Sequence, residues 1–160
     1  MSKKKFPYES VLIVCSVNTA RSRMAEGFLR DYFLKKCIDV EVFSGGISTN
    51  ARDGMLISMD ARLAMKEEGI ELSDKSTSIN LKKHPELIEK ADLILTLTEK
   101  HKKEIMEFTG HNKKNILTLK EFAGERGDII DPSMKELEGF RITRDEIKEC
   151  LLKGLKNLFD

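Results

Sequence analysis

The sequence of 160 residues is poor in cysteine, has almost no net charge and contains no long apolar run. Its three cysteines are an odd number at distant positions, so they do not form a disulfide framework and fit a reducing compartment. A formal net charge of +1 gives no overall basic field, which argues against nucleic acid as a partner. No stretch approaches the roughly 18 apolar residues of a membrane span, and the longest strand-like run is too short for a signal peptide. We therefore expect a cytoplasmic protein without membrane or nucleic-acid partners.

Linkers, internal repeats and low-complexity segments are also missing, which predicts a single domain over residues 1–160. The basic opening, residues 1–7, is expected to be a flexible terminus. The three histidines, His84, His101 and His111, have no metal-ligand spacing with one another or with cysteine. No metal and no cofactor are implied, and each histidine is expected at a solvated helix face or loop.

What the sequence does contain is a cysteine in an unusual setting. An apolar run ends in Cys15, five small or polar residues follow, and Arg21 and Ser22 then open a segment with the spacing of an amphipathic helix. The amino end of such a helix binds anions through unpaired N–H groups and a positive dipole end. Cys37 and Cys150 lack this setting and are predicted to be structural. We predict a phosphate-binding loop with Cys15 at its floor, formed by Ser16, Val17, Asn18, Thr19, Ala20, Arg21 and Ser22.

Each side chain has a chemical part in this prediction. The positive field favours the thiolate form of Cys15, which could attack phosphorus without a separate base. The planar guanidinium of Arg21 can bind two phosphate oxygens at once, and the Ser22 hydroxyl can donate a hydrogen bond to the sulfur. Val17 is β-branched and is expected at negative φ, which leaves Asn18 as the left-handed residue of the loop. A buried structural cysteine is the common alternative at a strand end.

The rest of the chain alternates apolar strands with amphipathic helices. Residues 44–46, Ser-Gly-Gly, are expected to stop the second strand, and a capping box at Thr143 and Glu146 is expected to begin the last helix. This alternation predicts an α/β fold, a single three-layer domain with a four-stranded parallel sheet and helices on both faces. In such sheets ligands bind beyond the carboxyl ends of the strands, which is where Cys15 is placed.

Residues 15–22, CSVNTARS, together with the Met-Ala-Glu that follows at 24–26, resemble the signature loop of the low-molecular-weight protein-tyrosine-phosphatase family. Asp131-Pro132 is similar to the general-acid motif of that family, and the likeness spans nearly the whole chain. The resemblance implies the family's fold and a protein phosphatase that hydrolyses phosphotyrosine through a phospho-cysteine. Cys15 would be the nucleophile, Arg21 the phosphate clamp and Asp131 the general acid and base. The partner would be a phosphorylated protein, and the protein itself a monomer or weak dimer.

The chain also departs from the family pattern. Arg23 replaces a frequent proline and is expected to add positive charge beside the loop, and Ala20 replaces a cysteine that can trap an oxidised nucleophile as a disulfide. Thr19 is the residue that the bacterial protein-arginine phosphatases of this family carry, so phosphoarginine stays open as the alternative substrate. The expected wall positions lack the aromatic residues of phosphotyrosine enzymes and hold Thr49, Asn50, Ser133 and Met134.

Three further alternatives stay open. Asp128 is the fallback for the general acid. A thioredoxin-coupled arsenate reductase would share the fold and the loop, but it needs a pair of relay cysteines, and residues 70–98 contain none. A non-catalytic phosphate-binding module would not need Cys15, Arg21 and Asp131 together, yet the chain has all three.

Overall fold

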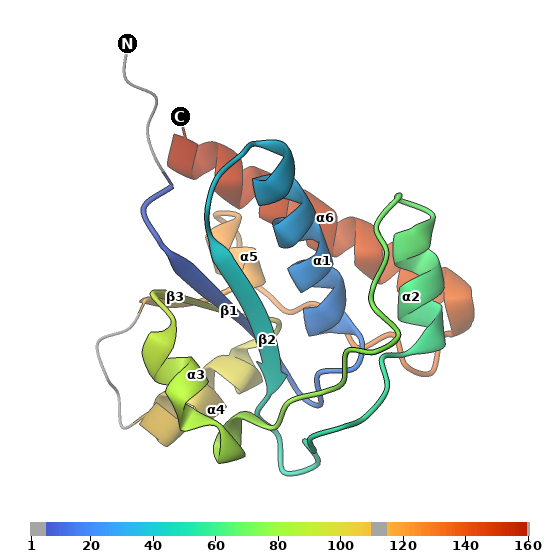
Figure 1. Ribbon diagram of the computed structural model, residues 1–160, viewed down its shortest axis with the longest axis horizontal. Coiled ribbons are helices and arrows are strands. Elements are labelled where there is room, and N and C mark those ends of the chain that lie inside the picture. The colour runs from blue at the N-terminus through green and yellow to red at the C-terminus, as the bar shows by residue number, and fades with distance from the viewer. Residues whose placement is uncertain (1–5, 110–114, 160) are drawn as a thin grey trace.

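The computed structural model describes residues 6–109 and 115–159. Strands and helices alternate along the chain, as Figure 1 shows. Within those ranges, no helix is both long and apolar enough to cross a membrane. In chain order the elements are β1 (Ser10–Cys15), α1 (Arg21–Lys35), β2 (Glu41–Gly46), α2 (Met59–Lys66), the 3₁₀ turn η1 (Leu81–Lys83), α3 (Pro85–Lys90), β3 (Leu93–Thr96), α4 (Glu99–Thr109), β4 (Asn115–Thr118), α5 (Leu119–Phe122) and α6 (Glu136–Phe159).

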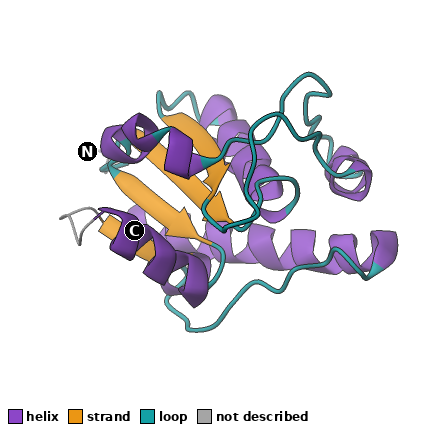
Figure 2. Cartoon of the chain, turned by 90° about the horizontal axis from the view of Figure 1, so that it is seen from below, coloured by secondary structure: helices purple, strands orange, loops and turns teal. Residues whose placement is uncertain are grey.

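The four strands form one parallel sheet in the order β2-β1-β3-β4. Every residue of β1 is buried, which is why this continuous apolar run takes a central place in the sheet. Val11 and Ile13 point into the core that α1, α5 and α6 cover, whereas Leu12 and Val14 point into the core under α3 and α4. The strands lie between helices in Figure 2, so the predicted α/β fold with helices on both faces is confirmed.

The start of α6 differs from the prediction. The helix begins at Glu136, and Thr143 lies buried inside it rather than at its end. The early start places Phe140 in the core, where it is 3% exposed, and this burial outweighs the local capping signal at Thr143. The capping box lies elsewhere: the Thr118 hydroxyl accepts from the Glu121 N–H at 3.0 Å and the Glu121 carboxylate accepts from the Thr118 N–H at 2.8 Å, which begins α5.

Strand β2 also runs further than predicted. Instead of stopping at residues 44–46, it continues through them and pairs Gly46 with Cys15. A Cβ atom on Gly46 would lie 2.7 Å from the Ser16 carbonyl oxygen, so glycine here permits the close approach of the loop to the strand. The two glycines therefore act as packing residues of the sheet rather than as its end.

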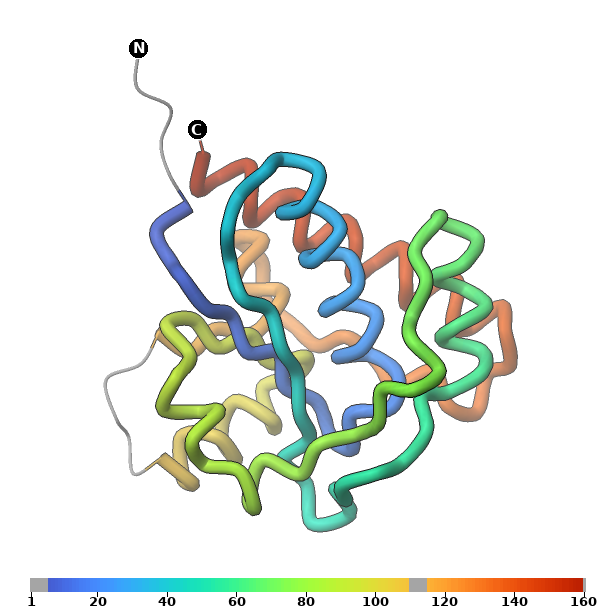
Figure 3. Tube along the Cα trace, in the orientation of Figure 1, coloured from blue at the N-terminus to red at the C-terminus, as the bar shows by residue number. Residues whose placement is uncertain are grey.

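The start of the described chain is anchored to its end. Most of the predicted flexible segment, residues 1–5, lies outside the described residues. Phe6, which the same prediction included, is instead buried, because its ring packs on Phe33 at 4.8 Å and on Phe159 at 6.1 Å between centroids. Figure 3 accordingly shows the first described residues beside the end of α6.

Candidate active site

Cys15 ends β1 and its sulfur is surrounded by hydrogen-bond donors. The Asn18 backbone N–H donates to Cys15 Sγ at 3.2 Å, and Ser22 Oγ lies 2.9 Å from the sulfur. Asn18 Nδ2 donates to Ser22 Oγ at 2.8 Å, and the Ser22 hydroxyl still has its own hydrogen, which it can donate to a thiolate sulfur. Cys15 is 3% exposed, so these two groups and the loop backbone enclose it. Hydrogen-bond donors around the sulfur are what a thiolate nucleophile needs.

The shape of the loop depends on Asn18. Its φ of 64° lies in the left-handed region, whereas Val17 is not among the described residues with positive φ, so both predictions about the loop backbone are confirmed. The Asn18 side chain is fully buried; its Nδ2 donates to Ser44 Oγ at 2.9 Å, and its Oδ1 accepts from the Ile79 N–H at 3.0 Å. The loop is thus tied both to β2 and to the segment before η1.

The amino end of α1 faces this loop. The helix begins at Arg21 after Ala20, and no side chain caps it, which leaves its first N–H groups for a ligand. The Arg21 side chain is buried, and its Nη1 donates to the Ile129 carbonyl oxygen at 2.7 Å. That bond joins the guanidinium to the segment that leads to Asp131, more than a hundred residues further along the chain.

The two candidate acids, Asp128 and Asp131, have different partners. Asp128 Oδ1 accepts from the Glu99 N–H at 2.8 Å and so caps the amino end of α4. Asp131 is exposed, and its Oδ1 accepts from the Ser133 N–H at 3.0 Å in a turn stabilised by Pro132. A helix cap thus engages Asp128, whereas Asp131 lies in an exposed turn on the segment that the Ile129 carbonyl oxygen joins to Arg21.

His101 is a part of the site that the sequence analysis missed. It was expected at the solvent, but it is 2% exposed on α4, and its Nε2 lies 2.8 Å from Ser16 Oγ. Burial, helped by the nearby charge of Arg21, lowers the pKa of His101 to about 4, so the ring is neutral at neutral pH. The sequence did contain a sign of this burial: His101 and Ile105 are four positions apart and so share one face of α4, the face that is buried.

The other two histidines are separate from the loop. His84 is half-exposed and its Nε2 lies 2.9 Å from Asp53 Oδ2, a contact that raises the pKa of His84. The Asn80 N–H, followed by His84, lowers the pKa of Asp53. His111 lies outside the described residues.

Arg23 was expected to add positive charge beside the loop, and the structure corrects this. The side chain is buried, and its Nη1 lies 3.2 Å from Glu26 Oε1. The charge of Arg23 is therefore balanced by a carboxylate rather than presented to a ligand. Ser44, which belongs to the same buried network, carried no sequence signal that pointed to the loop, whereas Glu26 was part of the family resemblance.

Comparison with known proteins decides which family this arrangement belongs to. The family model described as low molecular weight phosphotyrosine protein phosphatase matches residues 10–159. The chain belongs to this family. Its prediction as an enzyme of the phosphoric monoester hydrolase class, of the low-molecular-weight protein-tyrosine-phosphatase type, is thereby confirmed.

Relatives within the family carry three different names. A protein-arginine-phosphatase of Geobacillus stearothermophilus is 38% identical over 146 residues, which cover 91% of this chain and 92% of that protein. The crystal structure of a low molecular weight protein tyrosine phosphatase from T. tengcongensis is 31% identical, with a TM-score of 0.84 over 92% of this chain and 98% of that one. An arsenate reductase of Brevibacillus brevis is 29% identical and covers 87% of this chain and 88% of its own length.

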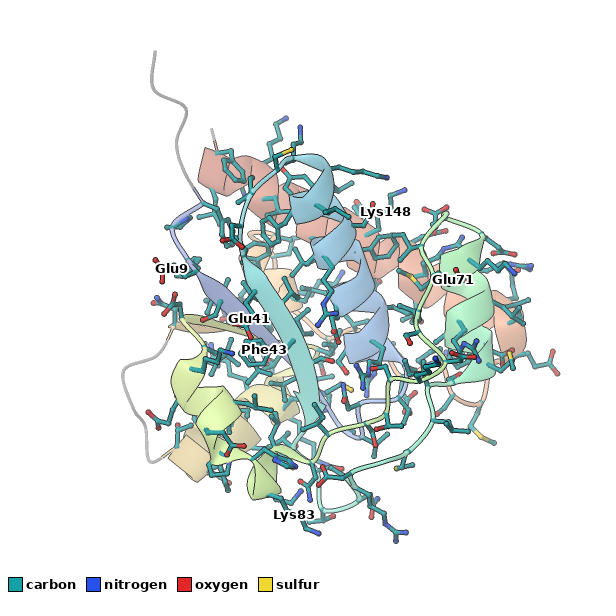
Figure 4. The ribbon with its side chains drawn as sticks, in the orientation of Figure 1. Glu9, Glu41, Phe43, Glu71, Lys83 and Lys148 are labelled. Atoms are coloured by element: carbon teal, nitrogen blue, oxygen red, sulfur yellow. The ribbon has the colours of Figure 1, made fainter. Side chains whose placement is uncertain are left out.

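The residues predicted as walls of the family's signature loop are exposed and non-aromatic in this member. The Ser48 N–H donates to the Ser16 carbonyl oxygen at 3.1 Å, which brings the segment after β2 against the loop. The four predicted wall residues are all exposed, and none is aromatic: Thr49, Asn50, Ser133 and Met134. In Figure 4, Glu9 and Glu41 lie at the amino end of the sheet, far from Lys83 beside the carboxyl end.

Proposed function

We propose that this protein is a protein phosphatase that removes phosphate from phosphoarginine through a phospho-cysteine formed on Cys15. The observation that carries the proposal is the Cys15 sulfur, buried at the carboxyl end of β1 with the Asn18 N–H and the Ser22 hydroxyl directed at it. Such a sulfur lies below the uncapped amino end of α1, where a phosphate dianion finds both N–H donors and a positive dipole.

The proposed reaction has two steps. In the first, Cys15 Sγ forms a bond to phosphorus while the bond from phosphorus to the leaving nitrogen breaks, and Asp131 gives its proton to that nitrogen. In the second, Asp131 takes a proton from a water molecule that attacks phosphorus, the P–S bond breaks, and inorganic phosphate leaves with the thiolate restored. Arg21 would hold two phosphate oxygens through both steps.

Phosphotyrosine, which the sequence analysis placed first, becomes the second candidate substrate. Thr19 and the absence of aromatic wall residues favour a guanidinium group over a phenyl ring. The higher identity to a relative named protein-arginine-phosphatase, 38% against 31% for the tyrosine phosphatase structure, points the same way. That structure still supports phosphotyrosine as a substrate of the same mechanism.

Arsenate reduction is a less well supported function for the same loop than phosphatase activity. It requires relay cysteines, and the two cysteines other than Cys15 lie at position 37, which is exposed at the end of α1, and at position 150, which is buried in α6. Neither lies in residues 70–98, the segment in which an arsenate reductase of this type would need its relay cysteines.

A side-by-side turnover assay on matched phosphoarginine and phosphotyrosine peptides tests the proposal. We expect a higher kcat/KM on phosphoarginine. Asp131→Asn should lower kcat on both peptides, and more on phosphoarginine, because the guanidine nitrogen is the poorer leaving group and depends more on the proton. Asp128→Asn is the matched control, since asparagine caps a helix about as well as aspartate. Equal activity of the Asp131 variant and the wild type would contradict the assigned acid, and faster phosphotyrosine turnover would reverse the order of substrates.

A further inference from the structure

A buried charged pair lies behind the phosphate-binding loop. Arg23 and Glu26, in the first turns of α1, are each 6% exposed, with Arg23 Nη1 3.2 Å from Glu26 Oε1. Burying two charges costs free energy unless both are well supplied with hydrogen bonds, and an apolar pair of the same size is often at least as stable. Stability alone therefore does not explain this pair, and its contacts indicate what else it does.

The guanidinium of Arg23 reaches three different parts of the chain. Nη1 contacts Glu26, Nε donates to the Asn18 carbonyl oxygen over a long 3.4 Å, and Nη2 donates to the Thr77 carbonyl oxygen. The fork thus holds the backbone of the loop at Asn18, the one loop residue with positive φ. Through the Thr77 carbonyl oxygen it also fixes the loop to the segment before η1, which the Ile79 N–H joins to the Asn18 side chain as well.

The carboxylate of Glu26 closes a ring on the same asparagine. Glu26 Oε1 accepts from the Ser44 hydroxyl, and Ser44 Oγ in turn accepts from Asn18 Nδ2 at 2.9 Å. Asn18 is therefore held from its main chain by Arg23 and from its side chain by Ser44. It is this residue that donates its backbone N–H to Cys15 Sγ and its Nδ2 to Ser22 Oγ.

We infer that Arg23 is a positioning residue for the phosphate-binding loop: it acts through Asn18, with Glu26 as its counterion, to hold the donors on the Cys15 sulfur and the loop around the phosphate. The inference rests on the proposed function, because it assigns Arg23 a part in the same site. A guanidinium suits this task because it offers directed donors in one rigid plane, which an ammonium cannot match.

Arg30 provides a matched control. Its Nη2 lies 2.8 Å from Glu26 Oε2, so it shares the counterion of Arg23, but its other contact is the Val42 carbonyl oxygen in β2. The Arg30 side chain is 61% exposed. Among the contacts of the described residues, it has none with the loop.

The experiment compares Arg23→Met with Arg30→Met, both in a Cys37→Ser background so that iodoacetamide reports on Cys15. Three quantities are measured: the inhibition constant of inorganic phosphate, the pH dependence of Cys15 alkylation, and kcat and KM on the better peptide. For Arg23→Met we expect kcat/KM to fall about 10- to 100-fold, as for other small displacements of catalytic groups. Phosphate should bind more weakly and the alkylation midpoint should move to higher pH. Arg30→Met should leave all three near the parent values.

Two more variants keep the test decisive if Arg23→Met folds poorly. Arg23→Lys keeps the charge without the fork, and the double variant Arg23→Met/Glu26→Gln removes the charged pair together. We expect both to show the weaker phosphate binding and the shifted alkylation. Variants that only melt at lower temperature, with parental phosphate affinity and alkylation profile, would overturn the inference. A parent protein that neither binds phosphate nor turns over either peptide would instead refute the proposed function, so the two failures are distinguishable.

Discussion

At the scale of single residues, the three cysteines differ in what surrounds their sulfur atoms. Cys15 is buried among donors, whereas Cys150 is buried in the apolar core under α6, where desolvation raises its pKa. Cys37 is exposed and ends α1 with a φ of 55°. Their chemistry therefore follows from position rather than from residue type.

Cys15→Ser is expected to abolish turnover while leaving the binding of inorganic phosphate in place. Serine keeps the loop and the donors, but its hydroxyl does not ionise near neutral pH. Turnover and phosphate binding by calorimetry measure the two effects separately. Cys37→Ser and Cys150→Ser serve as controls and should change only the melting temperature. Substantial activity in the Cys15 variant would refute the phospho-cysteine mechanism.

Thr19→Ile should depress phosphoarginine turnover far more than phosphotyrosine turnover. Thr19 is partly exposed in the loop, and its carbonyl oxygen accepts from the Ser58 N–H at 2.9 Å, so its backbone position is held while the side chain is exchanged. Reshaping a pocket by about a methylene is worth roughly 1–3 kcal/mol, or about 10- to 200-fold in relative kcat/KM. Equal losses on the two peptides would show that residue 19 does not set the preference.

The buried imidazole of His101 predicts a loss of stability in acid. Its pKa in the folded state, about 4, lies below the ordinary value of 6.5, so the folded protein binds fewer protons than the unfolded chain between these values. This contribution is complete above pH 6.5 and is lost as the pH falls through about 4. As the pH falls from 6.5 to about 4, the melting temperature of His101→Gln should therefore decrease less than that of the wild type. His84→Gln is the control; the raised pKa of His84 makes a contribution of opposite sign, so its removal should leave the acid loss intact.

At the scale of elements, α2 and α6 are joined by an ionic clamp. Arg141 binds Glu67 through Nε and Nη2, at 2.9 Å and 2.7 Å, and Arg144 adds a contact of 2.7 Å to the same carboxylate. Arg144 also donates to the Ala64 carbonyl oxygen near the end of α2. Hydrogen bonds from Arg141, followed by those from Arg144, lower the pKa of Glu67 to about 2. The clamp supports α2, which follows the Ser58 contact with the loop.

Glu67→Gln should lower the melting temperature at neutral pH and lose this effect in acid. Because the folded pKa of about 2 lies below the ordinary 4.5, the ionised clamp stabilises the fold above pH 4.5 and fades as the pH falls toward 2. Thermal unfolding of variant and wild type across this range measures the gap, which we expect to close at the acid end. Glu138→Gln, which removes one exposed partner of Arg141, is the control. A gap that is independent of pH would show that packing, not ionisation, is responsible.

Element boundaries depended on how local signals compare with tertiary burial. The proline-led α3 was predictable, because proline at one position decides its start. The start of α6 was not, since the early turns are stabilised by burying Phe140 in a core built from distant segments. Strand β2 likewise crosses two glycines because the neighbouring loop and strand leave room for nothing larger at Gly46.

At the scale of the whole molecule, the parallel sheet brings distant segments to one edge. Cys15 ends the central strand, Ile129 returns from beyond β4 to bond Arg21, and His101 on α4 meets Ser16 across 85 positions of sequence. Both layers of helices thus contribute to one loop, α1 from one face and α4 from the other (Figure 1). The carboxyl ends of the strands are where ligands of such sheets bind.

The sequence alone determined the fold class, the loop between residues 15 and 22, and the left-handed Asn18, because each depends on residue types a few positions apart. Only the tertiary structure decided which side chains support that loop. The bond from Arg23 to the Thr77 carbonyl oxygen, the contact of His101 with Ser16 and the bond from Arg21 to Ile129 join segments too far apart in sequence for a local pattern to show the contact. A periodic pattern in the sequence indicates which face of a helix is buried. A buried polar group, however, needs a hydrogen-bond partner, and that partner often comes from a distant segment that only the folded chain brings close.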